Sequence, residues 1–491
     1  MISPLLLALD QGTTSTRAIL FEASGKPIAT AQRELPQSYP RDGWVEHDPE
    51  RIVADALAVC WEVVNQRGSR PIAALGITNQ RETTVIWDRA SGRPVYPAIV
   101  WQDRRGADAC QALAAAGHED FIQQRTGLVL DSYFSATKIT WILDHVPNGR
   151  RRAESGELAF GTIDCFLIAR LTDGRVHATD ITNASRTLLF DIHRRRWSPE
   201  LLDLFGIPPA LLPEVKTSAA DFGATGMAGV TVPICAAIGD QHAALVGQAC
   251  LAAGMVKATF GTGCFVLANT GATPVRSTRR LLTTPAHALT TDVAYALEGS
   301  AFNVGTAIKW LRDELKIIAT ADETEALARS VDGNHGVYFV PAFTGLGAPY
   351  WDAAARGAIV GLTRDAGRNV LVRAALEAAA YQAADLLRTM QADGMPAPIA
   401  LRVDGGMANN NWLMQFLADV TGLAVERPRT TETTALGAAL AAALGAGVIA
   451  SPTAIPELWQ RAARFEPRMR PAERDQLIQG WDAAVAQVRQ H

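Results

Sequence analysis

The chain has 491 residues, of which 48% are hydrophobic and 20% are charged, and its formal net charge is −4 at pH 7. This length exceeds one ordinary hydrophobic core, so we expect two domains. The composition is that of a globular protein, and the small net charge argues against a dedicated binder of nucleic acid or of anionic membranes. Six scattered cysteines without a Cys-x-x-Cys pair favour reduced, buried thiols in a cytoplasmic protein over disulfides or a zinc site.

The first elements along the chain predict a strand, a tight loop and a second strand. Residues 5–9 are continuously apolar, as in a strand that is buried on both faces. Gly12 and the threonines after it interrupt the run, residues 17–21 resume it, and we expect a third strand at 27–35.

A helix is predicted to follow these strands. Asp48-Pro49-Glu50 supplies an acceptor at the cap, a proline at the first position and an acid in the first turn. The apolar face of this helix is formed by Val53, Leu57, Cys60 and Val64. A strand predicted at 72–78 then continues the alternation of strands and helices.

The second half of the chain opens like the first. Residues 255–260 predict a strand, Gly261-Thr262-Gly263 a loop, and residues 264–267 a second strand. Two similar hairpins half a chain apart indicate a duplicated architecture, with a domain boundary near 245–255. We place the domains at 1–248 and 249–491.

Near the end of the chain, residues 400–403 predict a strand that stops at Asp404-Gly405-Gly406. Asn409 is expected to cap the next helix, whose apolar face is Leu413, Phe416, Leu417 and Val420. Residues 434–444 are rich in Ala and Gly, which favours a packed helix that other backbone can approach closely over a membrane span.

Three of these loops have the composition of phosphate-binding sites: residues 12–15, 261–263 and 404–406. Glycine lets backbone N–H groups turn toward a phosphate, and Thr or Ser adds a hydroxyl. Each loop taken singly is more often only a turn. Asp10 lies directly before the first loop, and an acid beside phosphate is repulsive unless Mg²⁺ lies between them. Asp10 is therefore predicted to be a metal ligand.

The sequence resembles the FGGY family of carbohydrate kinases over essentially its whole length. The NQRETT and GLGAPYWD segments resemble in particular the members that phosphorylate glycerol. The resemblance is carried, in order, by LALDQGTTSTRA, GWVEHDP, GITNQRETT, AIVWQDRR, GLVLDSYFSATK, TNASRTLLF, GDQHAAL, FGTGCF, VPAFTGLGAPYWD, RVDGG and TALGAAL.

The resemblance implies an α/β protein with two ribonuclease-H-like domains of the actin-like ATPase fold, shared by sugar kinases, Hsp70 and actin. It implies that ATP and the acceptor bind between the domains, with Mg²⁺ as cofactor. Lys309 stands where many members carry Gln. The residues that match nucleotide-binding positions are Thr13, Thr14, Ser15, Arg17, Thr262, Gly305, Lys309, Gly406 and Asn410.

For the acceptor, the resemblance implies glycerol, held by hydroxyl ligands and aromatic walls. Asp240 would accept the proton of a terminal hydroxyl, and a cytoplasmic homo-oligomer, dimer or tetramer, is expected. Taken alone, Arg81-Glu82 could be a solvated ion pair, Trp101 ordinary core and Asp240 a helix cap. The matching positions are Arg81, Glu82, Trp101, Tyr133, Asp240, Gln241 and Phe265.

Two rival functions and one regulatory property follow from the same resemblance. The rivals are a kinase of the same family for a pentulose or gluconate, and a non-metabolic actin-like ATPase. Some bacterial members of the family are inhibited by fructose 1,6-bisphosphate at a Gly-rich loop that carries Lys and Arg. The matching residues 226–232 keep the glycines, but no Lys or Arg occurs between Lys216 and Lys257, so we expect insensitivity.

Overall fold

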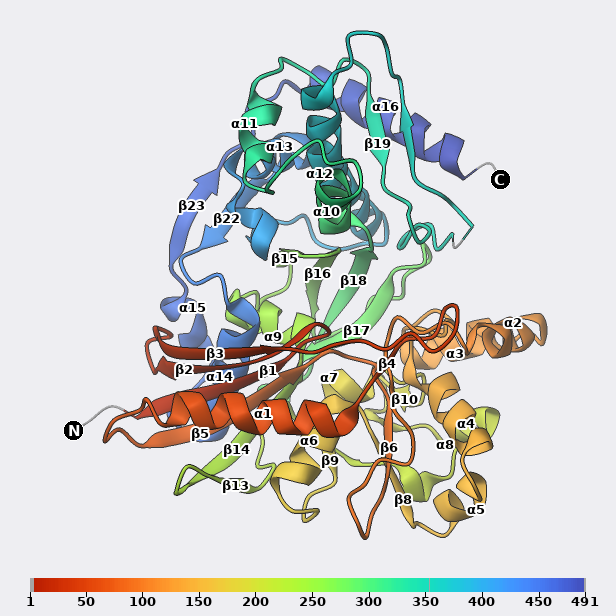
Figure 1. Ribbon diagram of the computed structural model, residues 1–491, viewed down its shortest axis with the longest axis vertical. Helices are drawn as coiled ribbons and strands as arrows, with labels where there is room; N and C mark the ends of the chain where they lie inside the picture. Colours follow the sequence, from red (N-terminus) through yellow and green to blue (C-terminus); the bar gives the residue numbers. More distant parts are fainter. Residues whose placement is uncertain (1–3, 353, 490–491) are drawn as a thin grey trace.

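The computed structural model describes residues 4–352 and 354–489, and two large sheets organise them (Figure 1). The first sheet has the strand order β13-β14-β5-β1-β2-β3, and the second has the order β17-β18-β16-β15-β21-β22-β23. Figure 1 shows the first sheet in the lower body and the second in the upper one, with the chain passing between them near its middle.

The first sheet begins with two antiparallel hairpins and continues with parallel strands. The β1 strand pairs antiparallel with β2, which pairs with β3, while β5 lies parallel to β1 and β14 parallel to β5. The predicted hairpins are confirmed. The strands are β1 (Leu5–Gln11), β2 (Ser15–Glu22), β3 (Pro27–Glu34), β5 (Ile72–Asn79), β13 (Ala224–Met227) and β14 (Val230–Gly239).

The second sheet repeats this plan. The β15 strand pairs antiparallel with β16, which pairs with β18, while β21 lies parallel to β15 and β22 parallel to β21. Without the edge strands β13, β17 and β23, the five remaining strands of each sheet share the order third-second-first-fourth-fifth, which confirms the duplicated α/β architecture. The strands are β15 (Val256–Phe260), β16 (Cys264–Gly271), β17 (Leu282–His287), β18 (Ala294–Ala301), β21 (Ala400–Asp404), β22 (Ala424–Pro428) and β23 (Arg461–Phe465).

Helices cover both sheets. The α1 helix (Pro49–Val64) packs on β2 and β3, and the Asp48 side chain caps it by accepting the Glu50 N–H, as predicted. In the second half, α12 (Arg368–Ala392) packs beside α10 (Val304–Asp313) and α13 (Asn411–Thr421). The apolar side chains between these layers form separate cores for the two sheets.

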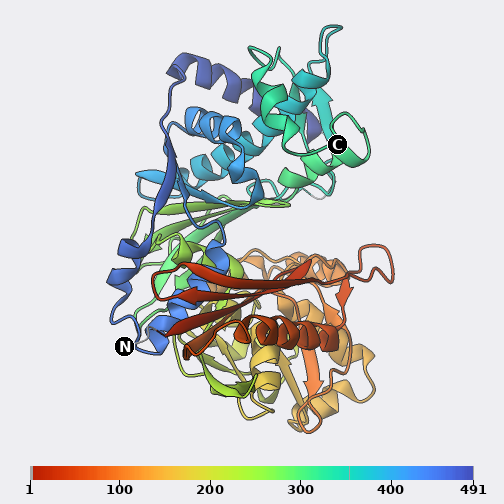
Figure 2. The same ribbon diagram turned by 60° about the vertical axis from the view of Figure 1, so that its left-hand side comes forward.

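The α14 helix (Thr433–Gly445) belongs to the second half in sequence but packs on the first sheet and on α9 (Asp240–Gly247). Its small residues permit very close contact, because a Cβ on Gly437 would lie 1.8 Å from the Ala243 carbonyl oxygen, and a Cβ on Gly76 would lie 2.1 Å from the Ala438 carbonyl oxygen. Figure 2 shows this blue helix within the body formed by the first half. No helix among the described residues is long and apolar enough to cross a membrane.

The predicted cap of α13 is wrong by one residue. Asn410, not Asn409, accepts the Leu413 N–H through its side chain, since a 3₁₀ turn over Gly406–Asn409 moves the helix start forward. All six cysteines are free and buried, as predicted. The domain limits 1–248 and 249–491 remain a prediction.

The remaining elements lie in the insertions between sheet strands. Those of the first half are β4 (Glu46–His47), β6 (Val85–Asp88), β7 (Ala98–Ile99), α2 (Ala107–Ala115), α3 (Glu119–Thr126), α4 (Ser135–His145), α5 (Gly149–Glu154), β8 (Leu158–Gly161), α6 (Ile163–Leu171), β9 (Ala178–Asp180), α7 (Ile181–Ala184), β10 (Phe190–Asp191), β11 (Arg196–Trp197), α8 (Pro199–Phe205) and β12 (Glu214–Lys216). Those of the second half are α11 (Glu323–Arg329), β19 (Tyr338–Val340), β20 (Ala358–Val360), α15 (Ile455–Leu458) and α16 (Pro471–Val488).

Candidate active site

A backbone hydrogen bond from the leading glycine closes each of the two Gly-Thr loops. In the first, the Gly12 N–H donates to the Ser15 carbonyl at 2.9 Å, and in the second the Gly261 N–H donates to the Gly263 carbonyl at 2.9 Å. Thr14 and Thr262 are exposed at the two tips. Both loops therefore offer a threonine hydroxyl and accessible backbone, which is what a phosphate site requires.

Gly305, at the start of α10, lies directly against the second loop. Its N–H donates to the Gly261 carbonyl at 3.1 Å, and a Cβ at this position would lie 2.3 Å from the same oxygen. Only glycine fits there without displacing the loop. Packing is thus a sufficient reason for this glycine, and its contact with a nucleotide remains a prediction.

Asp10 lies at the end of β1, opposite Arg17 on β2. Burial raises the pKa of Asp10 from 3.8 to about 7; Arg17 lowers it, while Asp240 and Glu432 raise it further. No donor within the described part of the chain forms a hydrogen bond with this carboxylate. A partly buried carboxylate that has no hydrogen-bond donor and that other acids repel is a group that a cation would stabilise.

No three His, Cys, Asp or Glu side chains of the described residues come close enough together to enclose a metal ion. A bound Mg²⁺ would therefore take most of its ligands from phosphate oxygens and water, as this ion commonly does. The single carboxylate of Asp10 fits that coordination. Arg17, expected on the phosphates, forms an ion pair with Glu432 and donates to Gln32 at 2.9 Å.

Asp240 is the first residue of α9, at the carboxyl end of β14. Its Oδ1 accepts the Gln241 N–H at 2.6 Å and lies 3.2 Å from Arg81 Nε, and its side chain is 27% exposed. Burial raises the pKa of Asp240, while Arg81 and the Gln241 N–H oppose that rise. A carboxylate that is accessible, oriented and more basic than usual is suited to accept a proton.

Arg81 and Glu82 are not a solvated pair, since they are 3% and 1% exposed. They belong to a buried cluster of four side chains, of which Arg186 and Glu298 were not predicted from the sequence. Arg81 donates from Nη1 and Nη2 to Glu298 at 2.6 and 2.9 Å. Arg186 donates from Nε to Glu82 Oε1 at 2.6 Å and from Nη2 to Glu298 Oε1 at 3.0 Å. The four side chains balance two positive with two negative charges.

Glu82 also has a backbone φ of 60°, a region that non-glycine residues seldom adopt. Its carbonyl accepts from the Ser135 hydroxyl at 2.9 Å and from the Thr84 hydroxyl at 3.0 Å. These hydrogen bonds, together with the Arg186 contact, hold the residue in this conformation. Backbone strain of this kind concentrates at functional sites.

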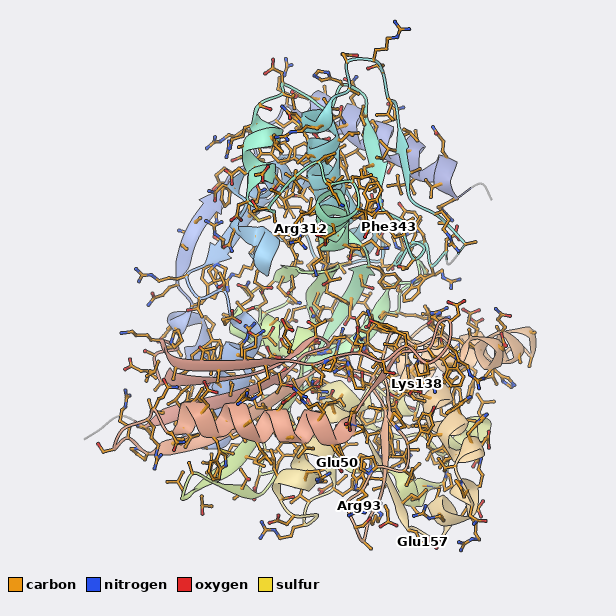
Figure 3. The ribbon with its side chains drawn as sticks, in the orientation of Figure 1. Glu50, Arg93, Lys138, Glu157, Arg312 and Phe343 are labelled. Atoms are coloured by element: carbon orange, nitrogen blue, oxygen red, sulfur yellow. The ribbon has the colours of Figure 1, made fainter. Side chains whose placement is uncertain are left out.

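Aromatic rings lie beside this cluster. Trp101 donates its indole N–H to the Thr13 hydroxyl at 2.9 Å, and its ring meets that of Tyr133 edge to face at 5.5 Å. Lys138, labelled on α4 in Figure 3, donates to the carbonyls of residues 132–134 and so fixes the segment that carries Tyr133. Trp101 therefore connects the acceptor side of the site to the first phosphate loop. Phe265, on β16, is partly exposed.

Gln241 is held by a lysine from the second sheet. Lys257 on β15 is fully buried and donates to Gln241 Oε1 at 2.5 Å and to the Thr259 hydroxyl at 2.9 Å. Because the amide oxygen is taken, the Gln241 NH₂ group is left to donate elsewhere. Lys257 was not predicted as a site residue, although a lysine within an otherwise apolar strand was a usable signal for one.

The remaining nucleotide candidates lie in the second half. Gly406 is exposed, and a Cβ there would meet nothing within 4 Å, so backbone is open to a ligand. Lys309 is exposed on α10. Asn410 caps α13 and donates to Thr324 at 3.2 Å, so its side chain already has a structural role.

One surface pocket lies away from these groups. About 850 Å³ in volume, it is bordered by β4, the start of α1 and residues 91–97, near the Glu50 and Arg93 labels of Figure 3. Its Arg170 is paired with Glu50 at 2.6 Å. A second pocket, of about 570 Å³, adjoins the first phosphate loop and includes Thr14 and Ser15.

Comparison with known proteins identifies the family of the chain. Residues 5–247 match the N-terminal domain, and residues 256–446 the C-terminal domain, of the FGGY family of carbohydrate kinases. The chain is 56% identical to "Glycerol kinase" of Ectopseudomonas mendocina and 57% identical to "Glycerol kinase 1" of Pseudomonas aeruginosa, with 99% of each chain covered. It is also similar to the crystal structure of Plasmodium falciparum glycerol kinase with ADP, with a TM-score of 0.93, 35% identity and coverage of 100% of this chain and 99% of that one.

Proposed function

The chain belongs to the FGGY family of carbohydrate kinases, and we propose that it transfers the γ-phosphoryl group of ATP to a terminal hydroxyl of glycerol, giving sn-glycerol 3-phosphate and ADP. The observation that carries the proposal is the placement of Asp240 at 3.2 Å from Arg81, beside the buried Arg81-Glu82 pair. Full-length relatives named glycerol kinase support the choice of acceptor.

The acceptor pocket suits three hydroxyls on a short carbon chain. Arg81 supplies N–H donors and Glu82 supplies carboxylate acceptors. Gln241, held by Lys257, presents its NH₂ group. Trp101, Tyr133 and Phe265 supply flat apolar surface for the carbon atoms, so that polar and apolar parts of glycerol both find partners.

The nucleotide occupies the other side of the site. Thr13, Thr14, Ser15 and Thr262 contact its phosphates from the two Gly-Thr loops. Arg17 leaves Glu432 to add a positive charge to these contacts. The rest of the nucleotide lies along the second half of the chain, at Gly305, Lys309, Gly406 and Asn410.

Asp10 would hold Mg²⁺ through its unpaired carboxylate, and a bound ion would supply positive charge to the phosphate oxygens. Its charge would also offset the burial and the repulsion by Asp240 and Glu432 that raise the pKa of Asp10.

Asp240 accepts the proton of the terminal hydroxyl, and the freed oxygen forms a bond to the γ-phosphorus. The bond from that phosphorus to the bridging oxygen of ADP breaks, and ADP leaves with the electron pair. Threonine hydroxyls and backbone N–H groups of the two loops stabilise the charge on the transferring group. Since the loops belong to different halves, closure assembles the site and excludes water, which would compete with glycerol.

The protein works in the cytoplasm as a homo-oligomer, a dimer or tetramer, with glycerol and ATP as its partners. Six buried, free thiols suit a reducing compartment. Light scattering of the purified protein measures the oligomeric state, and a monomer at working concentration contradicts that part of the proposal.

The decisive experiment supplies the purified protein with Mg-ATP and each acceptor in turn, and detects ADP. We expect glycerol to give the highest kcat/KM among glycerol, pentuloses, gluconate and water. A pentulose or gluconate as the best acceptor would assign another activity of the same family. ATP turnover that no acceptor stimulates would favour an actin-like ATPase instead.

A further inference from the structure

A carboxylate of the second domain lies within the acceptor-binding cluster of the first. Glu298 is in the middle of β18, opposite Leu267 on β16 and Leu282 on β17. It is 1% exposed, and the other side chains of its strand are uncharged, with only the hydroxyls of Tyr295 and Ser300 as polar groups. A charge buried in such a strand is costly unless several donors surround it.

Two arginines supply those donors. Arg81 binds Glu298 through both terminal nitrogens, at 2.6 and 2.9 Å, and Arg186 binds it through both of its own, at 3.3 and 3.0 Å. Arg186 then reaches Glu82 Oε1 at 2.6 Å. Glu298 therefore contacts Arg81 directly and is connected to Glu82 through Arg186.

These contacts determine what the pair can offer to an acceptor. A guanidinium has five N–H groups. Arg81 directs Nε toward Asp240 and one N–H from each terminal nitrogen toward Glu298, which leaves two for a ligand. One Glu82 oxygen accepts from Arg186, and the other has no hydrogen-bond partner within the described part of the chain. The pair thus presents donors and an acceptor side by side, which matches a hydroxyl that accepts from Arg81 and donates to Glu82.

We propose that Glu298 is a positioning residue by which the second domain fixes the acceptor-binding pair Arg81-Glu82 of the first. The proposal deepens the proposed function of the same site and rests on it. Glu298 also separates the positive charges of Arg81 and Arg186, which would otherwise repel each other in a buried space. Without its negative charge, Arg81 turns toward Asp240 and Glu82, and its donors are lost to the acceptor.

The test compares Glu298→Gln with a matched control, Glu426→Gln. Glu426 lies on β22 of the same sheet, is nearly buried, and pairs with Arg461 at 2.7 Å and Arg464 at 2.5 Å, but has no contact with the acceptor cluster. We expect Glu298→Gln to raise the KM for glycerol about 10- to 100-fold, the scale of one lost charge-assisted hydrogen bond. The KM for ATP should stay within about 2-fold of the wild-type value, since ATP does not touch the pair.

Glu426→Gln should leave the KM for glycerol unchanged. A folded Glu298→Gln protein with a wild-type KM for glycerol would overturn the proposal. Parallel rises in the KM values for glycerol and ATP would overturn it too, because they would indicate a general loss of structure.

If Glu298→Gln does not fold, Arg186→Lys replaces it. Lysine keeps the positive charge but cannot join Glu82 and Glu298 with one planar fork. The KM for glycerol should rise, and an unchanged value would overturn the proposal. The acceptor assay on the wild-type protein tests the proposed function separately. If that assay identifies an acceptor other than glycerol, the KM of each variant is measured for that acceptor instead.

Discussion

Replacing Asp10 by Asn should make the ligand-free protein more stable at alkaline pH while it disables turnover. The pKa of Asp10 is raised from 3.8 to about 7, so the folded chain binds this proton more tightly than the unfolded chain. The resulting stabilisation is fully present below the unfolded pKa of 3.8 and is lost as pH rises through about 7. Above that pH, the folded protein carries an ionised Asp10 carboxylate in surroundings that disfavour the charge.

The magnitude follows from the shift. A rise from 3.8 to about 7 corresponds to about 4 kcal/mol at 1.36 kcal/mol per unit. Because solvent reaches part of the side chain, we expect about 1–3 kcal/mol after screening. Asn removes the charge and keeps the shape, so Asp10→Asn should be more stable than the wild type by that amount at pH 8. The difference should shrink as pH falls toward 5 and should vanish below about pH 3.8, where Asp10 is protonated in both the folded and the unfolded chain.

The assay is thermal or denaturant unfolding of both proteins from pH 5 to pH 8.5, without Mg²⁺ or nucleotide. Asp164→Asn is the contrasting variant. Burial also raises the pKa of Asp164 to about 7, but Thr162 and Thr179 donate to its two oxygens at 2.5 and 2.6 Å, so Asn would disrupt these contacts and destabilise the fold. An Asp10→Asn protein that is no more stable than the wild type at pH 8, or whose gain does not depend on pH, would refute the reasoning.

Three further predictions concern the reaction. Asp240→Asn keeps the hydrogen-bonding shape but cannot take the proton, so kcat should fall by about 10²–10⁴-fold, and near-wild-type turnover would exclude this residue as the base. An ATP analogue with glycerol should compact the protein in X-ray scattering more than either ligand alone, whereas identical profiles would contradict closure. Fructose 1,6-bisphosphate at millimolar concentration should not inhibit, since residues 226–232, which form the tip of the β13–β14 hairpin, contain no Lys or Arg. Saturable inhibition, after correction for Mg²⁺ chelation, would mean that cations from elsewhere complete a site.

The sequence predicted those parts of the fold whose causes are local. Apolar runs on either side of the two Gly-Thr loops identified β1, β2, β15 and β16, and an acidic cap with proline identified the start of α1. The cap of α13 was misplaced by one residue because a 3₁₀ turn, which depends on how Gly405 packs against β15, precedes it. Local sequence contains no information on that contact.

The parts of the site that escaped prediction depend on long-range contacts. Glu298 and Arg81 are 217 positions apart, and only the packing of the two halves brings them together. A lone carboxylate in an apolar strand was a usable signal for Glu298, as was the buried lysine for Lys257. Gly305 shows the opposite limitation: the resemblance marks it as a nucleotide contact, whereas the structure shows that packing against Gly261 alone requires glycine there.

The two sides of the site differ in how far they are formed without ligands. On the acceptor side, Arg81, Glu82 and Gln241 already have their partners, and ion pairs between the two halves are buried there. On the phosphate side, the tips of both loops are exposed and Asp10 has no partner among the described residues. The buried ion pairs hold the two halves of the chain together beside Arg81 and Glu82. The closing motion that we propose would therefore bring the two Gly-Thr loops together on the phosphate side. Under the proposed function, such a division would place the ordering cost on nucleotide binding and leave acceptor recognition preorganised.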